Sequence, residues 1–176
     1  IGSTGTAANG WDKSTGVPVD NIDSAVNTVI GFGRRPNTMV MGHRVFQYLR
    51  KNAQVTGLFG NDERKALTID DLGPVFSSMF GIDNILVSAA VKNTAAIGAT
   101  PSLAQIWADD NVWVGYLNPS PSKEAPSATY SFTFEEMQAE TYRDEPSRAD
   151  VVRVRHTFAD KIVSANLGVV LKDVIA

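Results

Sequence analysis

The chain contains no cysteine and only two histidines, His43 and His156, and both shortages exclude chemistry. Without cysteine there can be no disulfide framework, zinc–thiolate site, iron–sulfur cluster or thiol nucleophile. No apolar run approaches the roughly 20 residues that cross a bilayer, and no stretch has the layout of a signal peptide. The net charge of −3 argues against a surface that coats nucleic acid. We therefore expect an intracellular-type domain without a membrane segment.

The chain has 176 residues, of which 43% are hydrophobic and 20% are charged, and this composition is typical of a globular protein. This length suggests one domain with a core that needs no covalent staples. Because the first residue is Ile1 rather than Met, we expect a cleaved product or an excised piece of something longer.

Hydrophobic spacing close to that of a helix dominates the first half of the chain. Trp11 is expected to anchor the start of the chain if it finds a pocket. The elements expected there are an irregular lead-in over 1–19, a helix over 20–30 with Asp20 as N-cap, a buried strand over 38–41, a helix over 43–52, a loop over 53–67, and a helix opened by a Thr68 and Asp71 capping pair and ended by Gly81.

The period changes to two in the second half, which indicates strands. The elements expected there are a strand over 85–91, a hairpin of 106–108 with 112–117 around an acidic turn, a Pro/Ser loop over 118–128, a strand with the aromatic face Tyr130, Phe132 and Phe134, a strand over 152–158, and a final strand over 168–175. Helices followed by strands predict an α+β fold.

Catalytic signatures are weak throughout. The sequence has no G-x-S-x-G elbow, and the Gly-rich start lacks the Lys of a phosphate loop. His43 at a helix start is expected to cap or face solvent, and His156 on an apolar strand face is expected to be a satisfied core histidine. We predict no catalytic, cofactor-binding or metal-binding residue, and no enzyme activity.

Charged clusters are expected to serve structure or assembly. Adjacent carboxylates at Asp70-Asp71 and Asp109-Asp110 predict a helix cap and a turn rather than a calcium loop. Arg34 and Arg35 are expected in a solvated turn. For Arg153 and Arg155, a solvated strand face and an intersubunit ion-pair face are equally good interpretations. The candidate intersubunit contacts are Asp62, Glu63, Arg64, Lys65, Arg153 and Arg155.

Several short segments follow one another in an order that resembles a known family. They are Trp11-Asp12, Pro18-Val19-Asp20-Asn21-Ile22, Arg35-Pro36-Asn37-Thr38-Met39-Val40-Met41-Gly42, Val45-Phe46-Gln47-Tyr48-Leu49, Phe80-Gly81-Ile82, Ile85-Leu86-Val87, Ala90-Val91-Lys92-Asn93-Thr94-Ala95, Ile106-Trp107, Val112 to Tyr116, and 152–175. Together they resemble the major capsid (coat) proteins of tailed bacteriophages, which have the HK97-like shell fold.

The resemblance implies an α+β capsid tile, mostly its axial domain, with a mixed sheet flanked by helices and with the N-terminal arm and spine helix missing. It divides the chain into a lead-in (1–19), an axial-domain-like core (20–150) and closing strands that return to the peripheral domain (151–176). It implies no cofactor, and it implies self-association into hexamers and pentamers of an icosahedral virion, assembled in the bacterial host cytoplasm. Further implied partners are scaffold, maturation protease, portal and packaged double-stranded DNA bound without sequence preference, but no membrane. The loops over 53–67 and 118–127 are expected at the capsomer centre or outer surface.

Three other classes of protein stay open. The first is an encapsulin-like or gene-transfer-particle shell protein. The second is an unrelated α+β enzyme or ligand-binding domain, and the third is a tail, portal-associated or decoration protein on another fold.

Overall fold

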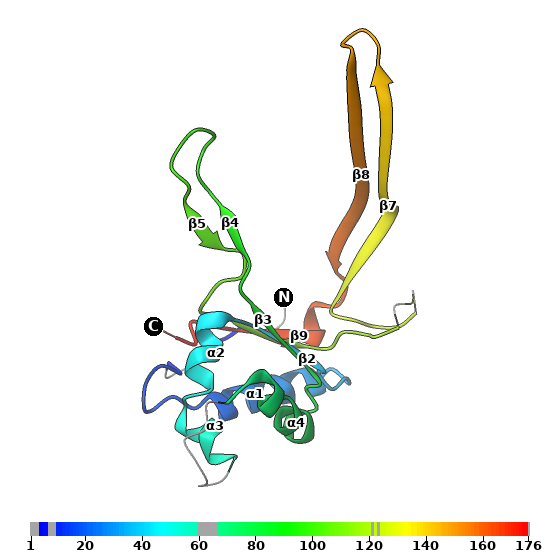
Figure 1. Ribbon diagram of the computed structural model, residues 1–176. Helices are drawn as coiled ribbons and strands as arrows, with labels where there is room; N and C mark the ends of the chain where they lie inside the picture. The colour runs from blue at the N-terminus through cyan, green and yellow to red at the C-terminus, as the bar shows by residue number, and fades with distance from the viewer. Residues whose placement is uncertain (1–3, 7–9, 60–66, 121, 123, 176) are drawn as a thin grey trace.

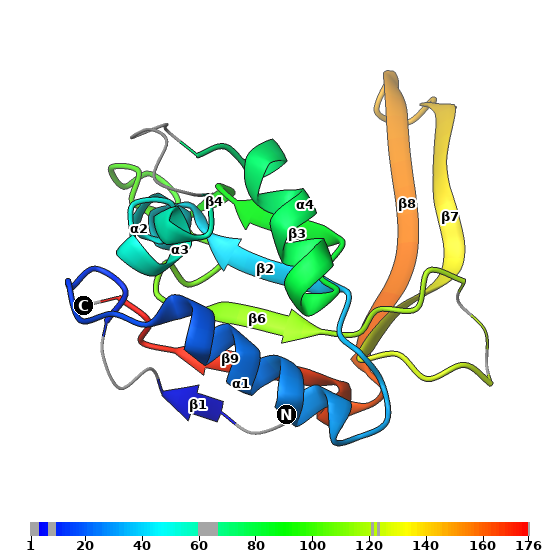
Figure 2. The same ribbon diagram turned by 90° about the horizontal axis from the view of Figure 1, so that it is seen from below.

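The computed structural model of the chain describes residues 4–6, 10–59, 67–120, 122 and 124–175. The α+β class is confirmed: a mixed sheet is covered by helices, and two hairpins project from it (Figure 1). Seen from the helix side, α1 and α4 lie across the sheet, and α2 and α3 lie at one end of the same layer (Figure 2). The helices are α1 (Pro18–Ile30), α2 (His43–Leu49), α3 (Ala53–Gly57), α4 (Ile69–Phe80) and the short 3-10 helix η1 (Ala165–Leu167).

The N-cap of helix α1 is Val17, three residues before the predicted Asp20. Pro18 occupies the first turn, where its missing N–H costs nothing, and Asp20 lies inside that turn. The Asp20 carboxylate accepts a hydrogen bond from Gln54 Nε2 at 3.0 Å, so it links α1 to α3. The predicted apolar face of this helix is buried at Ile22, Ala25, Val26 and Val29 but not at Ile30, which is 45% exposed, and Trp11 before the helix is buried.

Helix α3 corrects the prediction of a loop over 53–67 for its first five residues. The Asn52 side chain accepts a hydrogen bond from the Gln54 N–H at 2.9 Å and thereby caps the helix. The capping box of α4 is confirmed, because Thr68 and Asp71 bond each other's backbone N–H groups. The helix begins at Ile69, so Pro74 lies inside it.

The central sheet has the strand order β1-β9-β6-β2-β3. Its strands are β1 (Thr4–Thr6), β9 (Gly168–Lys172), β6 (Val112–Gly115), β2 (Thr38–Gly42) and β3 (Asn84–Ser88). Strand β6 is antiparallel to both neighbours, and the β1–β9 and β2–β3 pairs are parallel. The expected hairpin of 106–108 with 112–117 is wrong, because β6 pairs with β2 and β9 instead.

The register explains this pairing. Met39 lies between Val114 and Ile85, and Val114 lies next to Val169 on its other side. A parallel row one pleat further along runs through Val87, Met41, Val112 and Leu171. Both rows face the helix layer and join the core, whereas a local hairpin would leave Val112 and Val114 without these buried partners.

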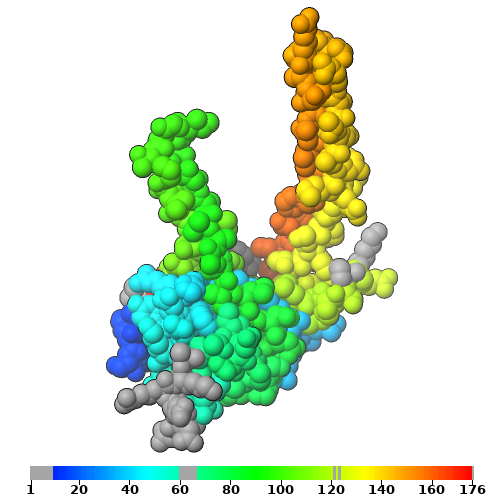
Figure 3. All heavy atoms as spheres, in the orientation of Figure 1, coloured from blue at the N-terminus to red at the C-terminus, as the bar shows by residue number. Residues whose placement is uncertain are grey.

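Two separate hairpins complete the fold. The shorter consists of β4 (Val91–Asn93) and β5 (Leu103–Gln105), so the predicted strand over 85–91 is divided between β3 and β4. The longer consists of β7 (Thr129–Asp144) and β8 (Ala149–Ile162). Both project away from the helix layer, and an open space separates them above the body (Figure 3).

Candidate assembly surfaces

The β7–β8 hairpin is a two-stranded ribbon with chemically different faces. Successive side chains of β8 point to opposite sides, so one side carries Val152, Val154, His156, Phe158, Asp160 and Ile162. The Asp160 carboxylate accepts a hydrogen bond from the Ser131 hydroxyl at 2.6 Å, and we call the other five residues the apolar stripe. All five residues are exposed, with 60% of Val154 and 55% of Phe158 open to solvent. A ribbon of two strands is marginally stable alone in water, so an uncovered apolar face of this length favours contact with another surface.

The opposite face of the ribbon is polar in its middle, where contacts join the two strands, and carries Tyr142 with Val151 toward the tip and Phe132 with Ala159 toward the base. Arg153 donates to Glu140 Oε2 from Nη2 at 2.8 Å and from Nε at 3.2 Å. The hydroxyl of Thr157 donates to Glu135 at 3.1 Å. The hydrogen bond and charge of Arg153 lower the pKa of the Glu140 carboxyl, and Glu140 in turn raises the pKa of Arg153. These contacts hold the two strands in register and leave the apolar stripe to the other side.

Two register shifts interrupt β7 between Thr133 and Gln138. Such bulges bend a ribbon and re-aim its side chains. Phe134 and Met137 lie in this irregular segment and are strongly exposed, Phe134 to 86%. The predicted aromatic strand is confirmed near the base of the ribbon, where Tyr130 and Phe132 meet edge to face at 6.1 Å.

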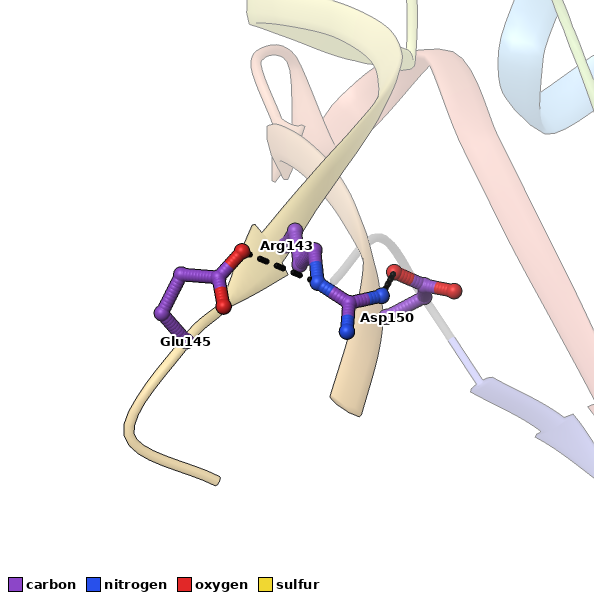
Figure 4. A network of polar contacts seen from close by, with 3 residues as sticks. All are labelled: Arg143, Glu145 and Asp150. Carbon is purple, nitrogen blue, oxygen red and sulfur yellow. Dashed lines mark hydrogen bonds and ion pairs between the residues drawn. The ribbon is translucent and has the colours of Figure 1, made fainter. Parts of the chain in front are cut away.

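The tip of the ribbon is closed by one arginine between two carboxylates. Arg143 donates from Nε to Glu145 at 2.9 Å and from Nη1 to Asp150 at 3.3 Å (Figure 4). Arg148 in the turn has a φ of 48°, a left-handed conformation that side chains rarely adopt. More than half of each of the three bonded side chains is exposed, so these ion pairs position the turn and contribute little stability.

The β4–β5 hairpin has a different character, because Lys92 is its only charged residue. Its tip is closed by Asn93, whose side-chain oxygen accepts hydrogen bonds from the N–H groups of Ala95 and Ser102, both at 3.0 Å. Ile97 and Leu103 are exposed. This hairpin is therefore a second projecting surface of small and apolar residues.

A groove of about 490 Å³ lies between α4 and β3. It is lined by Ile69, Asp70, Gly73, Pro74, Ser77, Asp83, Asn84, Ile85 and Leu86. The Ser77 hydroxyl donates to Asp83 Oδ1 at 2.6 Å. The groove therefore combines apolar walls with two carboxylates.

A smaller apolar cavity of about 130 Å³ lies where the long ribbon joins the sheet. Trp113 and Ile162 are among its lining residues. The Trp113 ring lies against Gly168, where an added Cβ would come within 2.7 Å of its Nε1. The cavity is therefore continuous with the base of the apolar stripe.

The structure separates the two histidines. His43 is exposed at the start of α2, as predicted, and its Nε2 lies 2.9 Å from Gln47 Nε2. His156 is also exposed and stacks on Phe158 at 4.8 Å, so the prediction of a core histidine is wrong. The alternation of side chains along the strand correctly predicted that His156 lies on the apolar face of β8. It could not show that this face lies outside the core.

The charged pairs found in the sequence serve local structure. Asp71 caps α4, and Asp109 and Asp110 lie in a turn, although not the turn of a hairpin. Arg34 lies 5.6 Å from the Tyr116 ring, and Arg35 donates to the Phe80 carbonyl at 3.1 Å. In the described parts of the chain, no three metal-ligating side chains come together.

Of the six predicted intersubunit residues, Asp62, Glu63, Arg64 and Lys65 lie outside the described residues. Arg153 and Arg155 share the polar face of β8, and only Arg153 has a described ion-pair partner, Glu140. Sequence analysis missed the groove between α4 and β3. The exposed Ile69 and Leu86 could have indicated it only once α4 and β3 were known to be neighbours.

The fold is shared with a class of phage-related structures. A phage-related protein from Bordetella bronchiseptica RB50 superimposes with a TM-score of 0.76 and 21% identity, over 94% of this chain and 54% of that one. A chain of Mycobacterium phage Che8 has a TM-score of 0.50 and 18% identity, over 97% of this chain and 52% of that one. The chain thus spans about half the length of each structure. No protein-family model and no curated protein sequence matches it.

None of the described helices is both long and apolar enough to cross a membrane.

Proposed function

We propose that this chain is a structural protein, a major capsid (coat) protein that self-associates into capsomers of the icosahedral head of a tailed phage or prophage. The observation that carries the proposal is the apolar stripe on β8, an exposed apolar face on a ribbon that projects from the body. The likeness of fold to two phage-related structures supports the proposal, as does the order of short segments that resemble coat proteins.

Association geometry is the mechanism of such a protein. A ribbon that leaves one side of the body and contacts a different surface of the next copy forms a heterologous contact. Contacts of this kind close into rings when the rotation between copies closes, and rings of pentamers and hexamers build a shell. The working location is then the virion, and scaffold, protease, portal and packaged DNA are its further partners.

Electron microscopy of the gene product, combined with sedimentation velocity, tests the proposal. We expect closed shells of uniform diameter or ring-shaped capsomers, with a sedimentation coefficient far above that of a 19.0 kDa monomer. A monomer at every concentration tested would overturn the proposal. Assembly into shells without DNA inside, around a protein cargo, would support the encapsulin-like alternative instead.

A further inference from the structure

Strand β3 forms an open edge of the central sheet. It lies last in the strand order, and no strand in the described chain pairs with its outer side. Proteins usually protect such an edge with a lysine, a proline or a bulge. Strand β3 contains neither lysine nor proline, and its register with β2 runs without a shift. Its outer backbone groups can therefore bind another strand.

The backbone groups at this edge belong to Ile85 and Val87. The Asn84 N–H donates to the Asn37 carbonyl, just before β2, at 3.0 Å. Because successive residues of a strand direct their backbone groups to opposite sides, Ile85 and Val87 direct theirs outward. Their side chains pack against the core on the helix side, whereas Leu86 between them lies on the other face and is 53% exposed.

The helix side of this edge is acidic. The groove between α4 and β3 is lined by Asp70 and Asp83. Asp83 accepts a hydrogen bond from Ser77, whereas the Asp70 carboxylate is exposed and makes no hydrogen bond or ion pair with any described residue. A strand that pairs here therefore needs a basic side chain on the helix side and an apolar side chain beside Leu86.

Strand β4 of the shorter hairpin has this pattern. The Thr94 N–H donates to the Ser102 carbonyl at 2.8 Å, so the backbone of Thr94 faces the β5 side of the hairpin. By alternation, Val91 and Asn93 direct their backbone groups to the outer edge of β4, which no described strand covers. Lys92 lies between them, is exposed, and makes no hydrogen bond or ion pair through its side chain with any described residue.

A parallel arrangement of the two edges meets both requirements. In a parallel pair, a residue that directs its backbone groups to the partner strand bonds the two neighbours of the residue opposite it. Val87 can thus lie opposite Lys92 and bond both of its neighbours. This register places Lys92 on the helix side, toward Asp70 at the start of α4. It also places Val91 beside Leu86 on the other face.

We propose that β4 of one copy pairs in parallel with the outer edge of β3 of a second copy. One chain cannot form this pair with itself, because parallel strands need a crossover of about a dozen residues or more and only Ala89 and Ala90 separate β3 from β4. The hairpin also projects away from the body that carries β3 (Figure 1). The contact joins two different surfaces, so it is heterologous and can continue around a ring. The inference deepens the proposed function and rests on it, since it names a pair of surfaces through which copies meet.

Because the chain has no cysteine, disulfide trapping is a clean test. Copies with Leu86→Cys are mixed with copies with Val91→Cys under oxidising conditions, and the products are separated without reductant. We expect a covalent heterodimer in several-fold excess over that from a control mixture of Ile30→Cys with Val91→Cys. Ile30 is a matched control because it is 45% exposed, close to the 53% of Leu86, and lies at the end of α1. Equal yields from both mixtures would overturn the inference.

Charge exchange tests the register. Lys92→Glu in the copy that carries Val91→Cys should reduce the cross-link to Leu86→Cys several-fold, because it brings a second carboxylate toward Asp70. Asp70→Lys in the other copy should then restore much of the yield. Lys51→Glu is the control, since Lys51 is also exposed but lies after α2, and it should leave the yield unchanged. A Lys92→Glu effect that Asp70→Lys does not rescue would contradict the placement of Lys92 in the groove.

Sedimentation velocity of the same samples separates the two proposals. If the copies associate but the cross-link between positions 86 and 91 does not exceed the control, this inference is wrong and self-association stands. If the copies do not associate at any concentration, the proposed function fails and this inference fails with it.

Discussion

Arg153 and Glu140 face each other across the β7–β8 ribbon, and two guanidinium nitrogens of Arg153 donate to the same carboxylate oxygen of Glu140. This contact lies on the polar face of the ribbon, opposite the apolar stripe. It gives Arg153 a partner in its own chain. A contact of Arg153 with a neighbouring copy stays a prediction. Arg155 lies on the same face, and its charge also helps to lower the pKa of Glu140.

Replacing Arg153 should return the titration of Glu140 to its ordinary range. Arg153 lowers the pKa of Glu140 first through the hydrogen bond and then through charge. Carboxyl chemical shifts followed by NMR should therefore give a higher pKa for Glu140 in Arg153→Gln than in the native chain. Identical values in both proteins would contradict the contact.

The Glu140–Arg153 pair makes the stability of the folded protein depend slightly on pH. Because the folded-state pKa of Glu140 is below its unfolded value, its contribution to stability is present above the unfolded pKa and is lost as pH falls through the folded pKa. The difference in melting temperature between the native chain and Glu140→Gln should be constant at neutral pH and shrink in acid. A difference that grew in acid would have the wrong sign.

Phe76 is expected to be a main support of α4. It is fully buried and its ring lies 5.4 Å from that of Phe80. Phe76→Ala should lower the free energy of unfolding by about 3–5 kcal/mol, as measured by chemical denaturation. The control is Met79→Ala on the same helix, which is exposed and should change stability by less than about 0.5 kcal/mol. Equal effects of the two would contradict the burial assigned to α4.

Gly81 combines a backbone requirement with a close contact. Its φ is 75°, and a Cβ there would collide with the Arg35 guanidinium. Gly33 has a φ of 85° but open space around it. Denaturation should therefore show a cost of about 1–2 kcal/mol for Gly33→Ala, from the left-handed backbone alone, and a larger cost for Gly81→Ala.

A double variant distinguishes these two contributions. Arg35→Ala removes the colliding group, so the combined Arg35→Ala and Gly81→Ala variant should be less destabilised than the sum of the two single changes. Strict additivity would mean that the contact between residues 35 and 81 is absent.

The helices were predictable because their signals are local. The capping box at Thr68 and Asp71 lies within one helical turn, and the apolar spacing of Ile22, Ala25, Val26 and Val29 covers only about two turns. Strand partners were not predictable in the same way. Val112 and Val114 indicated a strand, but their neighbours in the sheet are Met41 and Met39, more than 70 positions away in the chain.

The solvent exposure of the β8 side chains could not be predicted from the sequence. The alternation of Val152, Val154, His156 and Phe158 is what a half-buried strand in a core would also show. Only the three-dimensional arrangement reveals that β8 lies in a projecting ribbon and that the apolar stripe is open. The groove beside β3 likewise depends on residues of α4 and β3 that no local pattern connects.

The most direct test of the account is the assembly state of Val154→Glu compared with Ile30→Glu, observed by electron microscopy and sedimentation velocity. Both residues are exposed, so both variants should keep the melting temperature of the native chain. The account predicts that Ile30→Glu assembles like the native chain and that Val154→Glu stays monomeric, because a buried carboxylate in the apolar stripe is costly. Normal assembly of Val154→Glu would contradict the claim that the apolar stripe is the surface through which copies associate.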